Sequence, residues 1–426
     1  DLADVFLFLA SDAARAVQAA RSAPGGVSTL ILPADTAWNE AQRAEQKLPD
    51  TVAAPVSANA IDAAARLLSN GRKTALLLRG ASLYGAGLEA AGRVQAKTGA
   101  RLLCDTFAPH AELGAGRVPV ERIPYFAEQI VDFLKDFEQI IFVGAKPPVS
   151  FFAYPGKPSW CVPEGSHLSY LAHAHQDGAQ ALAALADSLG APARSPVRIP
   201  LQLPELPTGP LTALGVAQVI AAMTPENVIF ADESATASFA LLTTMARARP
   251  HTHLPLTGGS IGQGLPLAVG AAIAAPDRKV ICPHGDGGAA YTMQALWTMA
   301  REKLNVTTVI FNNAAYAVLN IELERVGAEE SAVGAKARSQ LDLAGPVIHF
   351  ADLGRSMGVP SVRATTTEEF VQALERALGT PGPHLIEAMV PPSLSGLKLK
   401  MLPKILGSLD GLPQPVARFL KRKIAP

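Results

Sequence analysis

The chain has 426 residues, which is enough for two or three domains of ordinary size, and its 49% content of hydrophobic residues can fill several buried cores. Its 37 basic and 37 acidic residues balance to a formal net charge of zero, so overall charge gives no argument for a nucleic acid or another highly charged partner.

Two further features bear on compartment and membrane. The three cysteines, Cys104, Cys161 and Cys282, share no metal-ligand spacing, and Cys104 and Cys282 lie in apolar runs typical of buried thiols in a reducing compartment. The longest apolar stretch, 265–275, is too short to span a bilayer, and no signal peptide is evident. We therefore expect a cytoplasmic protein without a membrane span.

The first 45 residues contain one predicted helix and one predicted strand. "SDAARAVQAARSAPGG" (11–26) has small apolar residues on one helical face and ends in Pro-Gly-Gly, and "VSTLILPAD" (27–35) predicts a buried strand. One helix and one strand cannot enclose a core. We expect residues 1–45 to be the C-terminal remnant of a larger domain, or to pack on a neighbour.

Helices and apolar strands alternate over 46–190. The pattern predicts helices at 61–71, 87–99 and 121–137, and strands at 73–80, 100–106 and 139–145. This alternation is typical of a parallel sheet covered by helices on both faces, so we predict a central α/β domain.

The proline-rich stretch 191–210 predicts a linker, and a second α/β domain is expected over 211–392. Its predicted strands are 227–233, 279–287, 307–313 and 384–390. The last segment, 393–426, carries seven basic residues and one acid. We predict a tail with a solvated basic face; a lid over the active site and contact with a membrane surface are the alternatives.

One turn in the second domain contains Gly285, Asp286, Gly287 and Gly288. Taken alone, it fits a tight turn, part of a calcium loop or a phosphate cradle. An amphipathic helix over 289–303 and a strand ending in Asn312-Asn313 follow, which makes a βαβ unit with parallel strands. Asp286 and Asn313 are then expected at the same carboxyl edge of the sheet, where ligands collect.

The chemistry of these residues fits a metal-bound phosphate. A carboxylate and an amide oxygen suit Mg²⁺, which often takes its remaining ligands from phosphate and water. Glycines at a helix N-terminus let the backbone approach phosphate oxygens closely.

The Gly285-Asp286-Gly287 turn, followed after 24 residues by Asn312-Asn313, resembles the diphosphate-binding signature of thiamin-diphosphate enzymes. Two further stretches resemble that family: "TGGSIGQGLPLAVGAAIA" (257–274) its aminopyrimidine-binding segment, and "ADESATA" (231–237) its other diphosphate-side turn. The middle region is similar to the family's Rossmann-like central domain, and the start is similar to the end of its pyrimidine-binding domain. The acetolactate synthase-like branch, which is related to benzoylformate decarboxylase, is the most similar.

The resemblance implies roles for individual residues. Asp286 and Asn313 would bind Mg²⁺ by side chain and Ala315 by its carbonyl. Gly259 would accept a hydrogen bond from the cofactor's 4′-amino group, and Ile261 would hold the cofactor bent, although core packing is the alternative for Ile261. The full expected cofactor-binding set is Ala235, Thr236, Gly259, Ser260, Ile261, Gly285, Asp286, Gly287, Gly288, Ala289, Asn313, Ala315 and Tyr316.

Several further residues are weaker candidates. His251, His253 and His284 are expected near the site, with His284 in a structural role. Tyr316, Val318 and Leu319 line a substrate pocket or pack within a helix. The loop 144–160 carries no strong nucleotide fingerprint. FAD, which acetolactate synthases bind in the central domain, is a further cofactor that the resemblance allows.

The chain departs from the family at the pyrimidine-activating glutamate. Residues 1–30 contain no glutamate, and the first one, Glu40, follows the strand that should end the domain. No residue of this chain is therefore assigned to that role, and we expect a truncated or incomplete form.

The resemblance implies a thiamin-diphosphate- and Mg²⁺-dependent decarboxylase and carboligase of 2-oxo acids, most like an acetolactate synthase of branched-chain amino acid biosynthesis that converts pyruvate to acetolactate. A simple decarboxylase of the benzoylformate type and a non-catalytic cofactor-binding protein are the alternatives. The family also implies a homodimer or homotetramer with the site at the interface.

Overall fold

The computed structural model describes residues 14–29, 31, 34–38, 51–154, 156–325 and 335–391, so the basic tail predicted at 393–426 lies outside them. The chain divides into two compact units. Unit 1 comprises Asp1–Thr106, Val118–Ala153 and Lys157–Val197, and unit 2 comprises Phe107–Arg117, Tyr154–Gly156 and Arg198–Pro426. The last division, after Val197, falls inside the stretch predicted as a linker.

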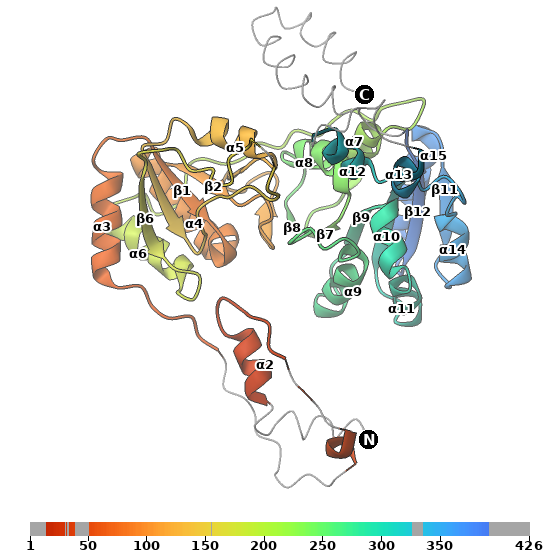
Figure 1. The fold of residues 1–426 in the computed structure, drawn as a ribbon, viewed down its shortest axis with the longest axis horizontal. Coiled ribbons are helices and arrows are strands. Elements are labelled where there is room, and N and C mark those ends of the chain that lie inside the picture. Colours follow the sequence, from red (N-terminus) through yellow and green to blue (C-terminus); the bar gives the residue numbers. More distant parts are fainter. Residues whose placement is uncertain are drawn as a thin grey trace, which may run out of the picture. The chain divides into compact units, whose positions relative to one another are not determined.

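Unit 1 contains a five-stranded parallel sheet (Figure 1). Its strands, in spatial order, are β4 (Glu121–Arg122), β2 (Arg101–Cys104), β1 (Thr74–Leu78), β5 (Gln139–Val143) and β6 (His167–Ala172). The helices are α2 (Ala14–Arg21), α3 (Ala58–Leu68), α4 (Gly85–Thr98), α5 (Ala127–Leu134) and α6 (Gly178–Ser188), with 3₁₀ turns η1 (Ala34–Ala37) and η2 (Gly80–Leu83).

The central strands of unit 1 are covered on both faces. Every residue of β1 and β5 is buried, as a continuous apolar strand requires. Leu77 of β1 belongs to one core with Ile130 and Leu134 of α5, whereas α6 packs against both α3 and α4. The predicted central sheet is therefore confirmed.

Two predictions in unit 1 are wrong. No strand forms in the described part of 27–35: residues 27–29 and 31 are irregular, and Ala34–Ala37 is a 3₁₀ turn. Val27 is 99% exposed and Ile31 83%, and no described strand pairs with this segment, so its backbone lacks the partner that a strand needs. The helix predicted at 121–137 starts only at Ala127, because Pro124 disfavours helical backbone at the residue before it and β4 occupies the beginning.

Unit 2 contains a seven-stranded sheet (Figure 1). Its strands, in spatial order, are β11 (Ser361–Ala364), β12 (His384–Met389), β10 (Val306–Asn312), β9 (Val280–Gly285), β7 (Val228–Asp232), β8 (His251–Pro255) and β3 (Ala111–Leu113). All pairs are parallel except β3 with β8. The sequence pattern predicted neither β3, which has only three residues, nor β8 and β11.

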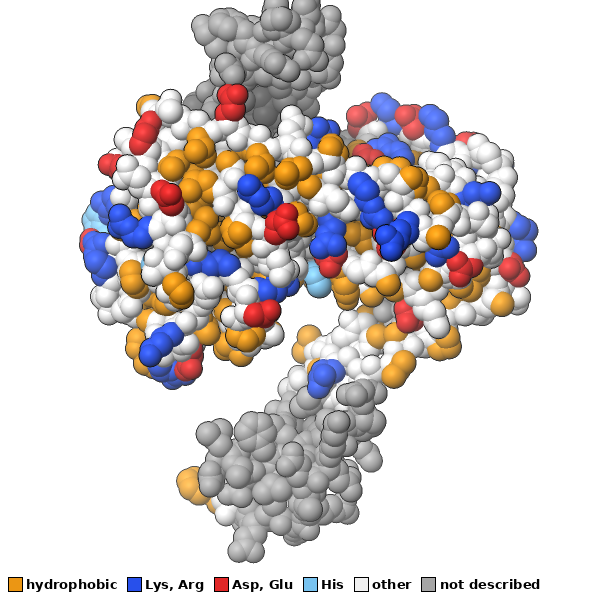
Figure 2. All heavy atoms as spheres, turned by 180° about the vertical axis from the view of Figure 1, so that it is seen from behind, with side chains coloured by type: hydrophobic (Ala, Val, Ile, Leu, Met, Phe, Trp, Pro, Cys, Tyr) orange, Lys and Arg blue, Asp and Glu red, His pale blue; other side chains and the backbone are white. Residues whose placement is uncertain are grey.

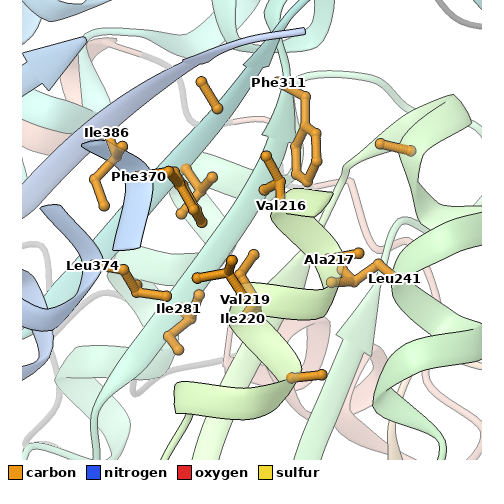
Figure 3. Packing of buried hydrophobic residues seen from close by; sticks show 14 of the residues in the cluster. Val216, Ala217, Val219, Ile220, Leu241, Ile281, Phe311, Phe370, Leu374 and Ile386 are labelled. Carbon is orange, nitrogen blue, oxygen red and sulfur yellow. The ribbon is translucent and has the colours of Figure 1, made fainter. Parts of the chain in front are cut away.

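Helices cover both faces of this sheet. The helices and turns are α7 (Ala213–Met223), α8 (Ser238–Met245), α9 (Gly264–Ala274), α10 (Asp286–Thr292), α11 (Ala295–Arg301), α12 (Ala317–Arg325), α13 (Ala335–Arg338), α14 (Phe350–Ser356), α15 (Thr367–Gly379), η3 (Ala235–Ala237) and η4 (Ser339–Leu341). Residues of α7, α8 and α15 pack in one core, where Val216 and Phe370 meet Ile281 of β9 (Figure 3). A second core joins α9, α10, α11 and α14 to the alternate strand residues.

The single helix predicted over 289–303 is instead two helices. α10 begins at Asp286 itself and ends at Thr292, and α11 begins at Ala295. At the start of α11, Leu296 N–H donates to Met293 O (3.0 Å) and Trp297 N–H donates to Gln294 O (3.1 Å). These backbone hydrogen bonds join residue i to residue i−3, whereas those of an α-helix join residue i to residue i−4. This break was not visible in the apolar periodicity.

The distribution of surface charges and the burial of the cysteines agree with the composition of the sequence. Figure 2 shows basic and acidic side chains interspersed over the face that it presents. Cys104, Cys161 and Cys282 are buried free thiols, as predicted for the first and the last. Within the described residues, every helix is too short or too polar for a membrane crossing.

Candidate functional site

The end of β9 and the end of β10 bring Asp286 and Asn313 together. β9 and β10 are parallel neighbours, so their carboxyl ends lie at one edge of the sheet. Asp286 Oδ2 accepts hydrogen bonds from the backbone N–H groups of Asn313 (3.1 Å) and Ala314 (2.7 Å). Its Oδ1 accepts from Gly287 N–H (2.8 Å). The predicted proximity of Asp286 and Asn313 is therefore present in the structure.

The Asp286 carboxylate lies in a buried environment. It is 5% exposed, and burial raises its pKa above the ordinary value, while the backbone N–H groups act in the opposite direction. Those N–H groups, rather than any Lys, Arg or His of the described chain, are its charge-stabilising neighbours. A buried carboxylate in this setting fits a divalent cation, which would supply the missing positive charge.

The residues after β10 form a turn beside this carboxylate. Ala314 has a φ of +53°, and Asn313 Oδ1 accepts from Ala315 N–H (3.0 Å). Ala315 pairs with Asp342, and Tyr316 N–H donates to Leu341 O (2.9 Å). Asn313, Ala315 and Tyr316 thus lie in one turn at the carboxyl edge of the sheet.

The described residues contain no group of three or more His, Cys, Asp or Glu that could hold a metal ion. A cation at Asp286 would therefore need some further ligands other than acidic, imidazole or thiol side chains. An amide oxygen, a carbonyl, water and phosphate are the oxygen ligands that Mg²⁺ accepts, so the donors present fit a phosphate-bridged Mg²⁺.

Glycine is required at two positions of α10 for packing. A Cβ on Gly287 would lie 2.4 Å from Cε1 of Tyr316, and a Cβ on Gly288 would lie 2.3 Å from Oε1 of Glu233. Ala289, the next residue, is fully buried in the core. The first turn of α10 is therefore closely packed against two other segments.

The turn after β7 reaches the same place from the other side. Ala235 has a φ of +50° and starts η3, and its Cβ lies 3.6 Å from the position of a Cβ on Gly285. Thr236 follows it in the same turn. The structure thus brings the 235–236 turn next to the start of α10, as the resemblance implies.

The 257–264 segment leads into α9. Gly258 and Gly259 have φ values of +60° and +65°, which favour glycine, and Gly259 O accepts from Ile261 N–H (3.0 Å). Ser260 is exposed, and Ile261 is 41% exposed. The core-packing alternative for Ile261 is therefore wrong for this chain.

One residue of this region was not predicted. Glu233, directly after β7, is 2% exposed, and its two oxygens accept from Gly262 N–H (2.5 Å) and Gly264 N–H (2.6 Å). A sequence signal existed, since an acid that directly follows a buried strand is placed at the ligand-binding edge. What the sequence could not show is which distant segment it would bind.

The three histidines differ in position. His284 is fully buried, and its Nδ1 lies 2.9 Å from Gly285 O, which fits the predicted structural role. His253 Nε2 lies 3.1 Å from Asp232 Oδ2. The expectation that His251 lies near the site is wrong: it is the first residue of β8 and pairs in register with Val228, the first residue of β7, so it lies at the amino edge of the sheet.

The two remaining candidates lie on α12. Leu319 is 44% exposed, and Val318 is half-buried. Their predicted contribution to a substrate pocket stays a prediction.

Comparisons with known proteins identify the family to which this chain is similar. The family model "Thiamine pyrophosphate enzyme, C-terminal TPP binding domain" matches residues 235–388. A Mycobacterium tuberculosis protein named "Putative acetolactate synthase large subunit IlvX" is 47% identical over 382 residues, which are 89% of this chain and 73% of that protein. Benzoylformate decarboxylase of Pseudomonas aeruginosa is 34% identical over 194 residues, 44% of this chain and 35% of that protein.

A solved structure is also similar. The thiamine diphosphate-dependent 4-hydroxybenzoylformate decarboxylase of Rhodococcus jostii RHA1 superposes with a TM-score of 0.68 at 25% identity, over 82% of this chain and 67% of that one.

Proposed function

This chain belongs to the thiamin-diphosphate-dependent enzymes, in their acetolactate synthase-like branch, and on that premise we propose that it decarboxylates a 2-oxo acid with thiamin diphosphate and Mg²⁺ and joins the product to a second carbonyl compound. The observation that carries the proposal is the buried Asp286 carboxylate beside Asn313, which accepts from one backbone N–H group at the start of α10 and from two in the turn after β10.

In this proposal Asp286 and Asn313 hold Mg²⁺ through side-chain oxygens, and Ala315 contributes its carbonyl oxygen. The N-terminus of α10 places Gly287 and Gly288 where their N–H groups can donate to a diphosphate. Ala235 and Thr236 approach it from the opposite side. The remaining residues proposed to contact the cofactor are Gly285, Ala289, Ser260 and Tyr316.

The other end of the cofactor is assigned to the 257–264 segment. The Gly259 carbonyl is proposed to accept from its amino group, and the exposed Ile261 side chain to press on it and hold it bent. When bound, thiamin diphosphate supplies the electron sink that decarboxylation of a 2-oxo acid requires. The protein's part is to hold, orient and desolvate that group.

Substrate choice separates the proposal from its first alternative. The relatives include proteins named for acetolactate synthase and for benzoylformate decarboxylase. With pyruvate, Mg²⁺ and thiamin diphosphate, the proposal predicts CO₂ release with acetolactate as the product. Acetaldehyde alone, or turnover of benzoylformate in preference to pyruvate, would assign the chain to the simple decarboxylases.

The second alternative is a non-catalytic cofactor-binding protein. It rests on the observation that residues 1–30 contain no glutamate. Cofactor binding without CO₂ release from either substrate would favour it. FAD is a separate proposal, tested by the visible absorbance of the purified protein, since oxidised flavin is yellow.

The proposal includes a homodimer or homotetramer in a reducing compartment such as the cytoplasm. Three buried free thiols support the compartment. Exposed apolar side chains near the site, such as Ile261 and Tyr291, support the association.

A further inference from the structure

The buried carboxylate of Glu233 is bound to the segment that leads into α9. Its Oε1 accepts from Gly262 N–H (2.5 Å) and its Oε2 from Gly264 N–H (2.6 Å), and the residue is 2% exposed. Glu233 itself lies at the end of β7 and is anchored there, because its N–H donates to Pro283 O (2.9 Å) and its carbonyl accepts from Gly285 N–H (2.9 Å). One side chain thus joins the 257–264 segment to the edge of the sheet.

The same carboxylate is packed against the start of α10. A Cβ on Gly288 would lie 2.3 Å from Glu233 Oε1, so only glycine leaves room for the carboxylate there. His284 Nε2 lies 3.2 Å from Glu233 Oε2 without making a hydrogen bond. Glu233 therefore lies between the segment assigned to the aminopyrimidine end of the cofactor and the helix assigned to its diphosphate end.

A hydrogen bond also joins the 257–264 segment directly to α10. Thr292, the last residue of α10, donates from Oγ1 to Gly262 O (2.7 Å). Gly262 is thus bonded at its N–H by Glu233 and at its carbonyl by Thr292.

Resting on the proposed function, we propose that Glu233 is a positioning residue that sets the distance between the two backbone segments holding opposite ends of thiamin diphosphate. A ligand that bridges two segments gains affinity when their spacing is fixed before it binds. A ligand that touches only the diphosphate side gains nothing from that spacing. The two kinds of ligand should therefore respond differently to changes at Glu233.

Glu233→Gln is the informative substitution. Glutamine keeps the size of the side chain but replaces one acceptor oxygen with an NH₂ group, which cannot accept from the Gly262 or Gly264 N–H. One buried backbone donor is left unpaired, so the 257–264 segment should shift away from α10.

The test is calorimetric titration of the full chain, in Mg²⁺, with thiamin diphosphate and separately with inorganic pyrophosphate. For Glu233→Gln we expect thiamin diphosphate to bind about tenfold more weakly and pyrophosphate to bind within about twofold of the parent. Thr292→Val removes the hydrogen bond from Thr292 to Gly262 O. It should likewise weaken the binding of thiamin diphosphate and leave the binding of pyrophosphate within about twofold of the parent. Lys279→Met is the matched control, because Lys279 donates to Ala377 O (2.5 Å) from the amino end of β9, and both affinities should be unchanged.

The outcomes separate this inference from the proposed function. Equal thiamin diphosphate affinity in the parent and in Glu233→Gln, or an equal loss for both ligands, overturns the positioning role while the proposed function stands. If Glu233→Gln does not fold, Thr292→Val decides by the same criterion. A parent protein that binds neither ligand overturns the proposed function, and the positioning role with it.

Discussion

Asp286 combines burial with a negative charge, and the neighbours that lower its pKa are backbone N–H groups. Asp286→Ala should therefore weaken Mg²⁺-dependent binding of thiamin diphosphate by more than about tenfold, because the metal loses its only charged protein ligand in the proposed site. Asn313→Ala should show a milder loss, since a neutral amide contributes less. Equilibrium dialysis measures both, and a variant of Asp286 that retains cofactor as tightly as the parent contradicts the assignment.

His251 provides a pH-dependent prediction away from the site. It is 2% exposed, its Nδ1 lies 2.8 Å from Arg249 O, and burial lowers its pKa to about 4. An unfolded histidine has a pKa of about 6.5, so the unfolded state binds the proton more readily and stability falls as pH drops from about 6.5 to about 4. The loss attributable to His251 is up to about 3 kcal/mol.

The measurement is the free energy of unfolding in urea at several pH values. His251→Asn keeps a donor toward the Arg249 carbonyl but does not titrate, so its stability should depend less on pH between about 6.5 and 4. A variant with the same slope as the parent shows that other titrating groups cause the acid loss.

At the scale of elements, α15 has a complete N-terminal cap. Thr366 Oγ1 accepts from Glu369 N–H (3.2 Å), and Glu369 Oε2 accepts from Thr366 N–H (3.2 Å). Thr366→Ala should lower the free energy of unfolding by about 1 kcal/mol, because buried Phe370 and Leu374 on this helix belong to the core in Figure 3. Thr380→Ala, at the opposite end of the helix, is the control; equal losses for the two variants contradict the capping role.

The strands of both sheets followed from sequence where they are apolar runs between turn residues, as with β1, β5 and β10. The elements that failed depend on information outside the local pattern. A strand at 27–35 needs a partner that the described chain does not provide. The break between α10 and α11 has no proline or glycine to mark it, and β3 is a three-residue strand that pairs with β8, itself not predicted.

The residues of the site likewise divide into those that local sequence patterns could predict and those that they could not. The meeting of Asp286 and Asn313 could be predicted because a βαβ unit fixes which strand ends are neighbours. The role of Glu233 could not, because its hydrogen-bond donors are 29 and 31 residues away along the chain. Topology is encoded in short patterns, whereas the bonds between loops depend on the completed packing.

For the whole molecule, exposed apolar side chains on unit 2 bear on association. Trp297 on α11 is 53% exposed, Tyr291 on α10 is 59% exposed and Ile273 on α9 is 59% exposed. Exposed apolar side chains gain free energy when another chain buries them. Sedimentation velocity should therefore show at least a dimer, and Trp297→Glu should shift it toward the monomer. If the parent protein is a monomer and still turns over a 2-oxo acid at full rate, the site cannot lie at an interface between two subunits.

The central claim is that the carboxyl edge of β9 and β10 binds a metal-bridged diphosphate. Crystals grown with thiamin diphosphate and Mn²⁺ in place of Mg²⁺ test it most directly, because anomalous scattering locates the metal without reference to activity. The account predicts one anomalous peak within coordination distance of the side-chain oxygens of Asp286 and Asn313, with cofactor phosphate on its other side. Bound cofactor with no metal peak at Asp286, or a peak elsewhere in the molecule, would contradict it.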